Sequence, residues 1–357
     1  MCARGGAGRS GRSRRGVLAM AASLSLAGCA AHLVPAGPTV APPSLAAHVF
    51  VMPDGARLPY RAWMPTGMPA GRPRAVMLAL HGFNDSRDAF AIAAPLFAAT
   101  GIAVFSPDQR GFGAAPGRGY WPGTATLVND ARTMADLLHR RYPHLPLYLL
   151  GESMGGAVLI LLASAPDPPP AAGYILAAPA VWGRADMNVL FRSALWLGWN
   201  LVPGLTLSGA GLVKASDNRA ALEALGDDPL TILDTRIDTI HGLVDLMTKA
   251  LDAAPRFHGP ALIQYGAHDQ LVPKRAMAAL WRALPKGAPI RLAYYAHGYH
   301  LLLRDLDRGR PIGDIIAWIR DPHAPLPSGA GRAARAWLAG RRRGGVSTEA
   351  GTRSSAG

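Results

Sequence analysis

The sequence predicts an α/β fold in which a mostly parallel central sheet of about eight strands carries helices on both faces. Three observations support this prediction. From about residue 48, short apolar runs alternate with longer segments of helical periodicity. The runs are apolar at successive positions, which is typical of parallel strands buried on both sides. One long interval, residues 181–255, lacks a clear strand and predicts a helical cap inserted after the sixth strand.

The expected elements follow one another in a regular order. A hairpin turned at Asp54-Gly55 opens the series within residues 48–65. Strands are expected next in the apolar runs AVMLAL, IAVFS, LYLL, YILAA, ALIQY and IRLAYY. Helices are expected near residues 88–99, 125–141, 154–164, 273–283 and 311–320.

Shifts in composition divide the chain further. Residues 30–47 are rich in proline and alanine, which is typical of a tether. Within the cap, Phe191, Trp196 and Trp199 are expected to form cap core more than substrate wall, although one residue can do both. The predicted boundaries are 1–28 for a targeting segment, 29–47 for the tether, 48–180 and 256–325 for the two parts of the core domain, 181–255 for the cap, and 326–357 for a basic disordered tail.

The first residues resemble a bacterial lipoprotein signal peptide. A basic stretch precedes an apolar run, residues 17–27, which is too short to cross a bilayer. The run leads into LAGC, which resembles a lipobox, so Cys29 is expected to carry lipid; the arginine pair at 14–15 also resembles a twin-arginine signal. We therefore expect an exported protein, lipid-anchored to a bacterial membrane and facing the periplasm, with Ala30 favouring the outer membrane. A frayed apolar N-terminus with a stray cysteine is the alternative.

Charge and cysteine content argue against several classes of protein. The formal net charge is +14, but residues 1–28 and 331–357 carry most of it and leave about +4 between them. The body shows no basic face with interleaved aromatics, so nucleic-acid binding is not expected. With only Cys2 and Cys29, a chain cleaved before Cys29 can form no internal disulfide. Neither metal-ligand spacing nor a phosphate-binding loop is present, so no metal and no cofactor are predicted, and the oligomeric state is left open.

A lone serine follows an apolar run in the stretch LYLLGESMGGAVLI. The run predicts a strand and the residues after the glycines predict a helix, so Ser153 is expected in a strand-to-helix turn. The order Gly151, Glu152, Ser153, Met154, Gly155 matches the G-x-S-x-G nucleophile elbow, in which glycines permit strained angles and a close approach of the helix. A glycine-rich turn with an incidental serine is the alternative.

A serine hydroxyl needs a base and an orienting acid before it acts as a nucleophile. Asp269 follows the expected strand ALIQY, at the edge where parallel sheets place their sites. A helix-capping aspartate is the alternative there. The last strand leads to two histidines, of which His300 precedes an apolar run and is favoured over His297. The order serine, aspartate, histidine differs from that of both major serine-protease classes.

An anion site is expected in LALHGFNDS, where a strand ends before His81 and Gly82. The backbone N–H of Phe83 would complement that of Met154 in stabilising an oxyanion. His81 itself is expected to order the loop rather than to act as the base.

These stretches resemble the α/β-hydrolase fold and, within it, the monoacylglycerol lipase and lysophospholipase branch that is grouped with serine aminopeptidases. The resemblance implies Ser153 as nucleophile, His300 as base and Asp269 as its orienter. It also implies Phe83 and Met154 as oxyanion donors and needs no cofactor. The matching segments are LHGFNDS, SPDQRGFGAAPGRGYW, GESMGG, DDPL, GAHDQLVP and HGYHLL, spread over about residues 50–320.

One loop both matches and departs from this family. Asp108 and Arg110 match its structural loop, for which a buried ion pair is expected. Phe112 stands where the family usually has a second histidine. The residues Ala114-Ala115-Pro116 replace a serine of the family, so substrate preference does not transfer in detail.

The apolar cap and the resemblance together predict hydrolysis of a monoacyl lipid ester, a monoacylglycerol or a lysophospholipid, through an acyl-enzyme. The alternatives are a serine aminopeptidase or a hydrolase of other small esters or thioesters. An aminopeptidase needs an acidic group for the substrate amine, with Asp186, Asp217 and Glu223 as candidates. Ser153 argues against haloalkane dehalogenases and epoxide hydrolases, which need an aspartate nucleophile. From another class, a non-catalytic acyl-binding lipoprotein is the further alternative.

Overall fold

A computed structural model describes residues 31–66, 73–209 and 213–350, with residues 341–350 as backbone only. The predicted signal peptide, Cys2 and the lipidation candidate Cys29 lie outside the described residues.

The central sheet has nine strands in the order β1-β2-β3-β5-β4-β6-β7-β10-β11. The first three pair antiparallel, β3 is antiparallel to β5, and the remaining neighbours are parallel. The strand that makes nine rather than about eight is β1, which lies inside the stretch predicted to be a tether. The strands are β1 Ser44–Ala46, β2 Val49–Val51, β3 Arg57–Trp63, β4 Ala75–Leu80, β5 Ile102–Pro107, β6 Leu147–Glu152, β7 Gly173–Ala177, β10 Ala261–Gly266 and β11 Ile290–Tyr295.

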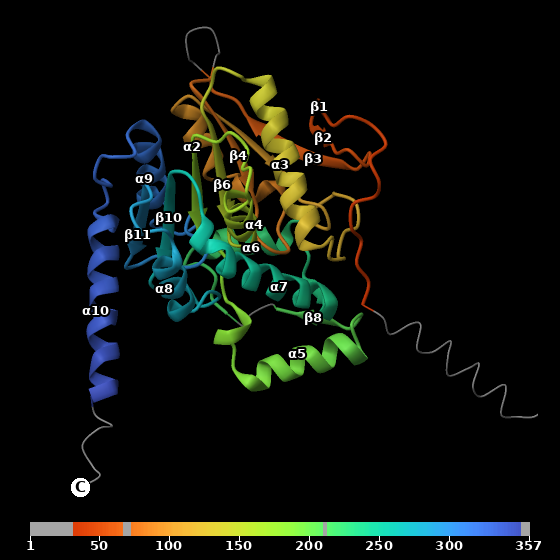
Figure 1. Ribbon diagram of the computed structural model, residues 1–357. Helices are drawn as coiled ribbons and strands as arrows, with labels where there is room; N and C mark the ends of the chain where they lie inside the picture. The colour runs from red at the N-terminus through yellow and green to blue at the C-terminus, as the bar shows by residue number, and fades with distance from the viewer. Residues whose placement is uncertain (1–30, 67–72, 210–212, 351–357) are drawn as a thin grey trace, which may run out of the picture.

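Helices cover both faces of the sheet (Figure 1). Successive side chains of a strand point to opposite faces, and β4 shows the result. Val76 and Leu78 belong to the core beneath α3, α4 and α8, whereas Ala75 and Met77 belong to the core beneath α2 and α9. Every residue of β4 is buried, as a two-sided strand requires. These helices are α2 Ala94–Ala99, α3 Thr124–Arg141, α4 Met154–Ala163, α8 Lys274–Ala283 and α9 Gly309–Arg320, with the short helix η2 at Arg87–Phe90.

The cap lies between β7 and β10 and is mostly helical, as predicted. It also contains two short strands that pair antiparallel, β8 and β9, which the sequence did not predict. Helix α7 packs on α4 of the core and α5 packs on α7, so that α5 forms the outer layer of the cap (Figure 1). The cap elements are η3 Arg184–Asp186, α5 Val189–Leu201, β8 Thr206–Ser208, α6 Arg219–Asp227, β9 Asp234–Arg236, α7 Ile237–Ala253 and η4 Ala254–Arg256.

The described chain starts at the cap. The N–H of His32 donates to Asp238 Oδ2 at 3.1 Å, and Leu33 forms a bridge with Trp121. Asp238 belongs to the first turn of α7. Among the described residues, no helix combines the length and the apolar character that crossing a membrane requires.

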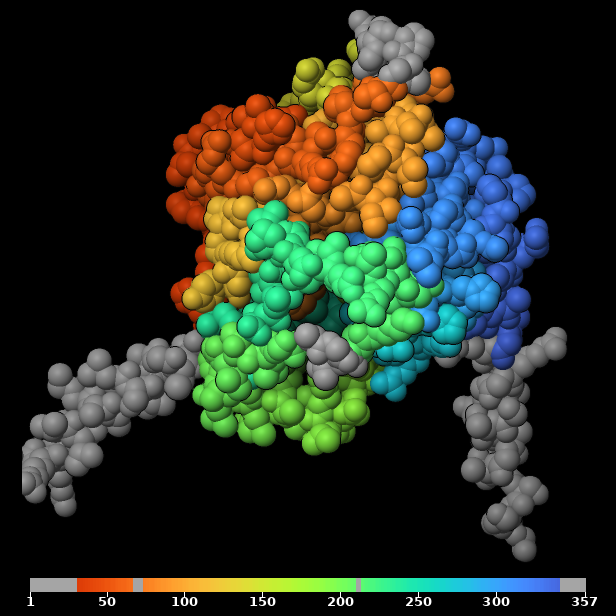
Figure 2. Space-filling model, turned by 180° about the vertical axis from the view of Figure 1, so that it is seen from behind, coloured from red at the N-terminus to blue at the C-terminus, as the bar shows by residue number. Residues whose placement is uncertain are grey.

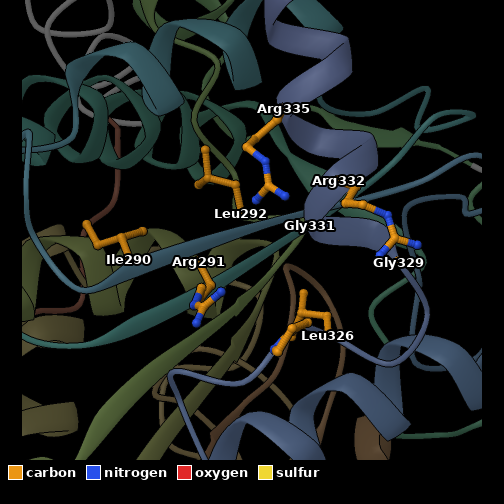
Figure 3. Close-up of a pocket in the computed structure, with 9 residues that line it drawn as sticks. Ile290, Arg291, Leu292, Leu326, Gly329, Gly331, Arg332 and Arg335 are labelled. Atoms are coloured by element: carbon orange, nitrogen blue, oxygen red, sulfur yellow. The ribbon is translucent and has the colours of Figure 1, made fainter.

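The prediction that residues 326–357 are disordered is wrong for helix α10, Ala330–Ala350. Its first turns lie across the edge strand β11 (Figure 3). Ala334 is fully buried, and the ring of Trp337 stacks on Tyr294 with centroids 5.2 Å apart. Alanine, arginine and glycine make up most of this stretch, so the few larger apolar residues at helical spacing are hard to recognise in the sequence. A helix over an edge strand also removes a site for unwanted strand pairing.

Candidate active site

The three predicted catalytic residues and the supporting His81 each follow the carboxyl end of a parallel strand. His81 comes directly after β4, Ser153 after β6, Asp269 after β10 and His300 after β11. Because these ends meet at one edge of the sheet, residues far apart in sequence converge there.

Ser153 has the strained backbone of an elbow, with φ 51° and ψ −111°. A positive φ is uncommon for a residue with a side chain. Two hydrogen bonds hold it, one to the last residue of β7 and one to the loop that follows: the Ser153 N–H donates to the Ala177 carbonyl at 3.0 Å, and the Ser153 carbonyl accepts from Ala180 N–H at 2.9 Å. The turn is therefore fixed by its neighbour strand.

The glycines around Ser153 leave room for this turn. A Cβ on Gly151 would lie 2.5 Å from the carbonyl oxygen of Gly155. A Cβ on Gly155 would collide with the backbone of Leu80. Any side chain at these positions would push α4 away from β4 and β6.

His300 and Asp269 form a buried pair. The Nδ1 of His300 lies 2.8 Å from Asp269 Oδ2, and the residues are 2% and 7% exposed. The other carboxylate oxygen, Oδ1, accepts the N–H groups of Leu271 and Val272 at 2.8 and 2.9 Å. Asp269 is thus oriented from one side and orients His300 on the other.

Burial lowers the pKa of His300, but the charge and hydrogen bond of Asp269, with Glu152 and Asp305, outweigh burial and raise that pKa. The acid limb of kcat/KM on a soluble ester should therefore have its midpoint above pH 6.5, the ordinary value. As the pH falls through the raised pKa, the imidazole gains a proton and can no longer accept one from serine. Measuring kcat/KM between about pH 5 and 9 tests this. A midpoint below about pH 6 would contradict it.

The other two histidines discussed in the sequence analysis, His297 and His81, have different surroundings from His300. His297 is exposed, whereas His300 is buried beside Asp269. His81 is fully buried: its Nδ1 donates to the Gly82 carbonyl at 2.7 Å and its Nε2 accepts from Gln109 N–H at 3.0 Å. Burial lowers the pKa of His81, which favours this neutral form. His81 therefore orders the loop.

The predicted anion site lies beside Ser153. A Cβ on Gly82 would lie 3.4 Å from Ser153 Cβ, and Phe83 lines the same cavity as Ser153. Met154 is the first residue of α4, and the first N–H groups of a helix have no partner within it. Met154 thus directly follows Ser153 in the chain, and Phe83 lies in the lining of the same cavity.

The structural loop holds buried ion pairs, but Asp108 and Arg110 are not partners of each other. Asp108 Oδ2 accepts from Arg87 Nη1 at 2.6 Å. Arg110 binds Asp54 and Asp130 with two hydrogen bonds each. Phe112 packs its ring edge-on to His81 and Phe83, with centroids 5.9 and 5.6 Å away. An aromatic ring therefore supports the loop that contains Phe83, the predicted oxyanion donor.

Sequence reasoning missed Asp85 and Arg304 and named Glu152 only as part of the elbow. Arg304 donates to Asp85 and, at 3.1 Å, to Glu152 Oε1. All three residues are buried. The available signal was a lone arginine placed directly after three leucines.

A cavity of about 620 Å³ opens above these residues, and its lining includes both Ser153 and His300. Figure 2 shows the face hollowed between the green and teal segments of the cap. The apolar wall comes mainly from the cap: Trp182, Phe191, Leu207, Ile232, Leu243 and Met247. The candidates for an amine site, Asp186, Asp217 and Glu223, are not among the described residues that line it.

The aromatic stripe of the cap is not cap core, contrary to the prediction. Phe191 lines the cavity and stacks on Trp182, while Trp196 is 60% exposed. Trp199 stacks on His241 of α7. None of the residues of α5 is buried, because α5 lies outside α7.

Among the residues that the structure describes, no group of three histidine, cysteine or acidic side chains is placed to hold a metal ion.

Comparison with known proteins adds a family. The family model described as "Serine aminopeptidase, S33" matches residues 71–307. Monoglyceride lipase of Homo sapiens is 30% identical over 261 residues, covering 72% of this chain and 84% of that protein. Monoacylglycerol lipase of Mycolicibacterium smegmatis is 26% identical, covering 76% and 96%.

Solved structures share the fold. A soluble variant of monoglyceride lipase from Saccharomyces cerevisiae, in complex with a substrate analog, superimposes with a TM-score of 0.66 at 21% identity, covering 82% of this chain and 100% of that one.

Proposed function

The chain belongs to the serine aminopeptidase family of α/β-hydrolases and is a carboxylic ester hydrolase, and we propose that its substrates are monoacyl lipids, with monoacylglycerols preferred. The predicted α/β-hydrolase fold is confirmed by the solved relatives. One observation carries the proposal: an elbow serine and a histidine paired with aspartate line a single apolar cavity. Such a wall suits one acyl chain.

In the proposed mechanism, Ser153 is the nucleophile. Asp269 accepts from His300 Nδ1, so the neutral imidazole keeps its proton there and Nε2 accepts the serine proton. As Oγ bonds to the ester carbon, the N–H groups of Phe83 and Met154 stabilise the oxyanion. His300 then protonates the departing alcohol. Water hydrolyses the acyl-enzyme by the same route and releases the fatty acid.

The cavity favours an ester over an aminoacyl substrate. The carboxylates in the described part of its lining are Asp85 and Glu152. Both are ion-paired with Arg304, and their side chains are only 8% and 0% exposed, so neither is an open carboxylate for a substrate ammonium. An aminopeptidase needs a free acid at this place.

The test is a substrate panel given to the full chain and to Ser153→Ala. It contains a monoacylglycerol, a lysophospholipid of the same acyl chain, a short p-nitrophenyl ester and an aminoacyl amide. We expect the monoacylglycerol to give the highest kcat/KM and the amide no turnover. Labelling by a fluorophosphonate without turnover of either lipid would refute the substrate class, and absence of both labelling and turnover would favour the acyl-binding alternative.

We also propose that the chain is exported and lipid-anchored through Cys29, facing the periplasm with the outer membrane preferred. The basic and apolar stretch before LAGC supports this. An apolar outer surface on the cap agrees with it, since Leu190 and Trp196 of α5 are 81% and 60% exposed.

Two variants test the membrane proposal. Cys29→Ser should move the protein from the membrane fraction to the soluble fraction, because the acyl chain has lost its attachment. The double variant Leu190→Gln, Trp196→Gln should lower turnover of a vesicle-embedded monoacylglycerol about tenfold and leave a soluble ester unaffected, because apolar surface contributes to interfacial binding. Because the cap surface also binds membranes, the lipid is measured directly: wild-type protein whose Cys29 carries no acyl group in mass spectrometry would rule out the anchor.

A further inference from the structure

Arg304 lies where three loops of the site meet. Its Nη2 donates to Asp85 Oδ2 and, at 3.1 Å, to Glu152 Oε1. The three side chains are 7%, 8% and 0% exposed, so water screens these charges little. One guanidinium group thus joins two carboxylates inside the protein.

Each member of the cluster stands next to a different catalytic part. Glu152 directly precedes Ser153. Asp85 lies two residues after Phe83, and its N–H donates to the Gly82 carbonyl at 3.4 Å, closing the turn that contains Phe83. Arg304 follows His300 by one turn, with its N–H bonded to the Leu301 carbonyl at 2.8 Å.

Burial of these three charged groups carries a desolvation penalty that apolar side chains would not carry. Two buried carboxylates share one guanidinium, and Glu152 Oε2 and Arg304 Nε find no partner among the described residues. Burial raises the pKa of Glu152 against the opposing charge of Arg304. Apolar side chains of similar volume often stabilise such a place as well or better. What they cannot supply is a fixed, directional link between three loops.

We propose that Arg304 is a positioning residue that fixes the separations among Ser153, His300 and the Phe83 N–H by holding Asp85 and Glu152 together. This inference rests on the catalytic roles proposed above. A small displacement of any of the three groups would cost rate in the chemical step rather than binding of the acyl chain, because the apolar wall is built by other residues.

The test compares two conservative variants of buried arginines. Arg304→Lys keeps the charge but loses the rigid guanidinium plane that fixes Nη2, the nitrogen that donates to both carboxylates. We expect kcat on a short ester and the rate constant of fluorophosphonate labelling to fall about thirtyfold, with KM within about twofold. Arg110→Lys is the control, since the Arg110 side chain is equally buried and is bonded to Asp54 and Asp130, neither of which lies next to Ser153, His300 or Phe83. It should lower Tm and leave kcat per labelled site unchanged.

If Arg304→Lys keeps the wild-type kcat per folded molecule while its Tm falls like that of Arg110→Lys, Arg304 is structural only and the inference is wrong. Should Arg304→Lys not fold, Glu152→Gln decides. The charged groups that face His300 are Asp269, Glu152 and Asp305. Glu152→Gln removes the second of these charges, and it should lower kcat about tenfold and move the acid limb to lower pH. An unchanged kcat and pH profile would overturn the inference. A wild-type protein that neither labels nor hydrolyses esters would instead refute the proposed function.

Discussion

Ser153→Ala is expected to lower kcat about a million-fold on every ester that the chain hydrolyses, because no acyl-enzyme can form. The backbone of Ser153 is held by hydrogen bonds to Ala177 and Ala180 that do not involve its side chain. Folding should therefore be unaffected, with Tm within about 2 °C of the wild type. Single-turnover kinetics and calorimetry of the two proteins measure both quantities. Retention of more than about a hundredth of the wild-type kcat would mean that another residue is the nucleophile.

Ser153→Gly separates strain from chemistry. A residue held at φ 51° and ψ −111° costs about 1–3 kcal/mol, and glycine removes most of that cost. Glycine also loses more conformational entropy on folding than alanine, which offsets up to about 1 kcal/mol of this gain in stability. We expect Ser153→Gly to be inactive and to melt a few degrees above Ser153→Ala, since about 1 kcal/mol shifts Tm by about 2–4 °C. A lower Tm than that of Ser153→Ala would show that the elbow is not strained.

Asp269→Asn is expected to lower kcat about ten-thousand-fold. The Oδ1 of Asp269 already accepts two backbone N–H groups, so the asparagine oxygen must take that side. The amide NH₂ then faces His300 Nδ1, which has to accept, and the ring proton moves to Nε2, where it blocks proton removal from Ser153. The fold should survive, because the two backbone bonds are kept.

The measurement is kcat on a p-nitrophenyl ester together with the fluorophosphonate labelling rate. Asp245→Asn is a matched control, since Asp245 also lies near a histidine, His241, but in a partly exposed pair on the cap. It should leave kcat unchanged. If Asp269→Asn retained a tenth of the wild-type kcat, His300 would not need this partner.

Local sequence patterns were sufficient to predict most of the fold and the three candidate catalytic residues. The run at β6 and the glycines after it define a strand, a turn and a helix within fourteen residues, so Ser153 could be placed without knowledge of the rest. Asp269 and His300 were predictable for a similar reason: each follows a strand-like run, and the topology of parallel sheets brings such ends together.

What escaped the sequence depends on contacts between distant side chains. Asp85 and Arg304 are 219 positions apart, and no spacing rule connects them. Helix α10 was missed because its composition is that of a solvated tail, and only the surface of β11 makes a helix worthwhile there. The exposure of Trp196 follows from the place of α5 outside α7, which its own sequence does not state.

The bond between His32 N–H and Asp238 ties the beginning of the described chain to the cap. His32 lies three positions after Cys29, a distance of at most about 10 Å of extended chain. With Cys29 acylated, the cap would stay close to the membrane that holds the lipid, and the enzyme would have little freedom to reach a second bilayer. Such a protein would hydrolyse only lipids of the leaflet to which it is attached.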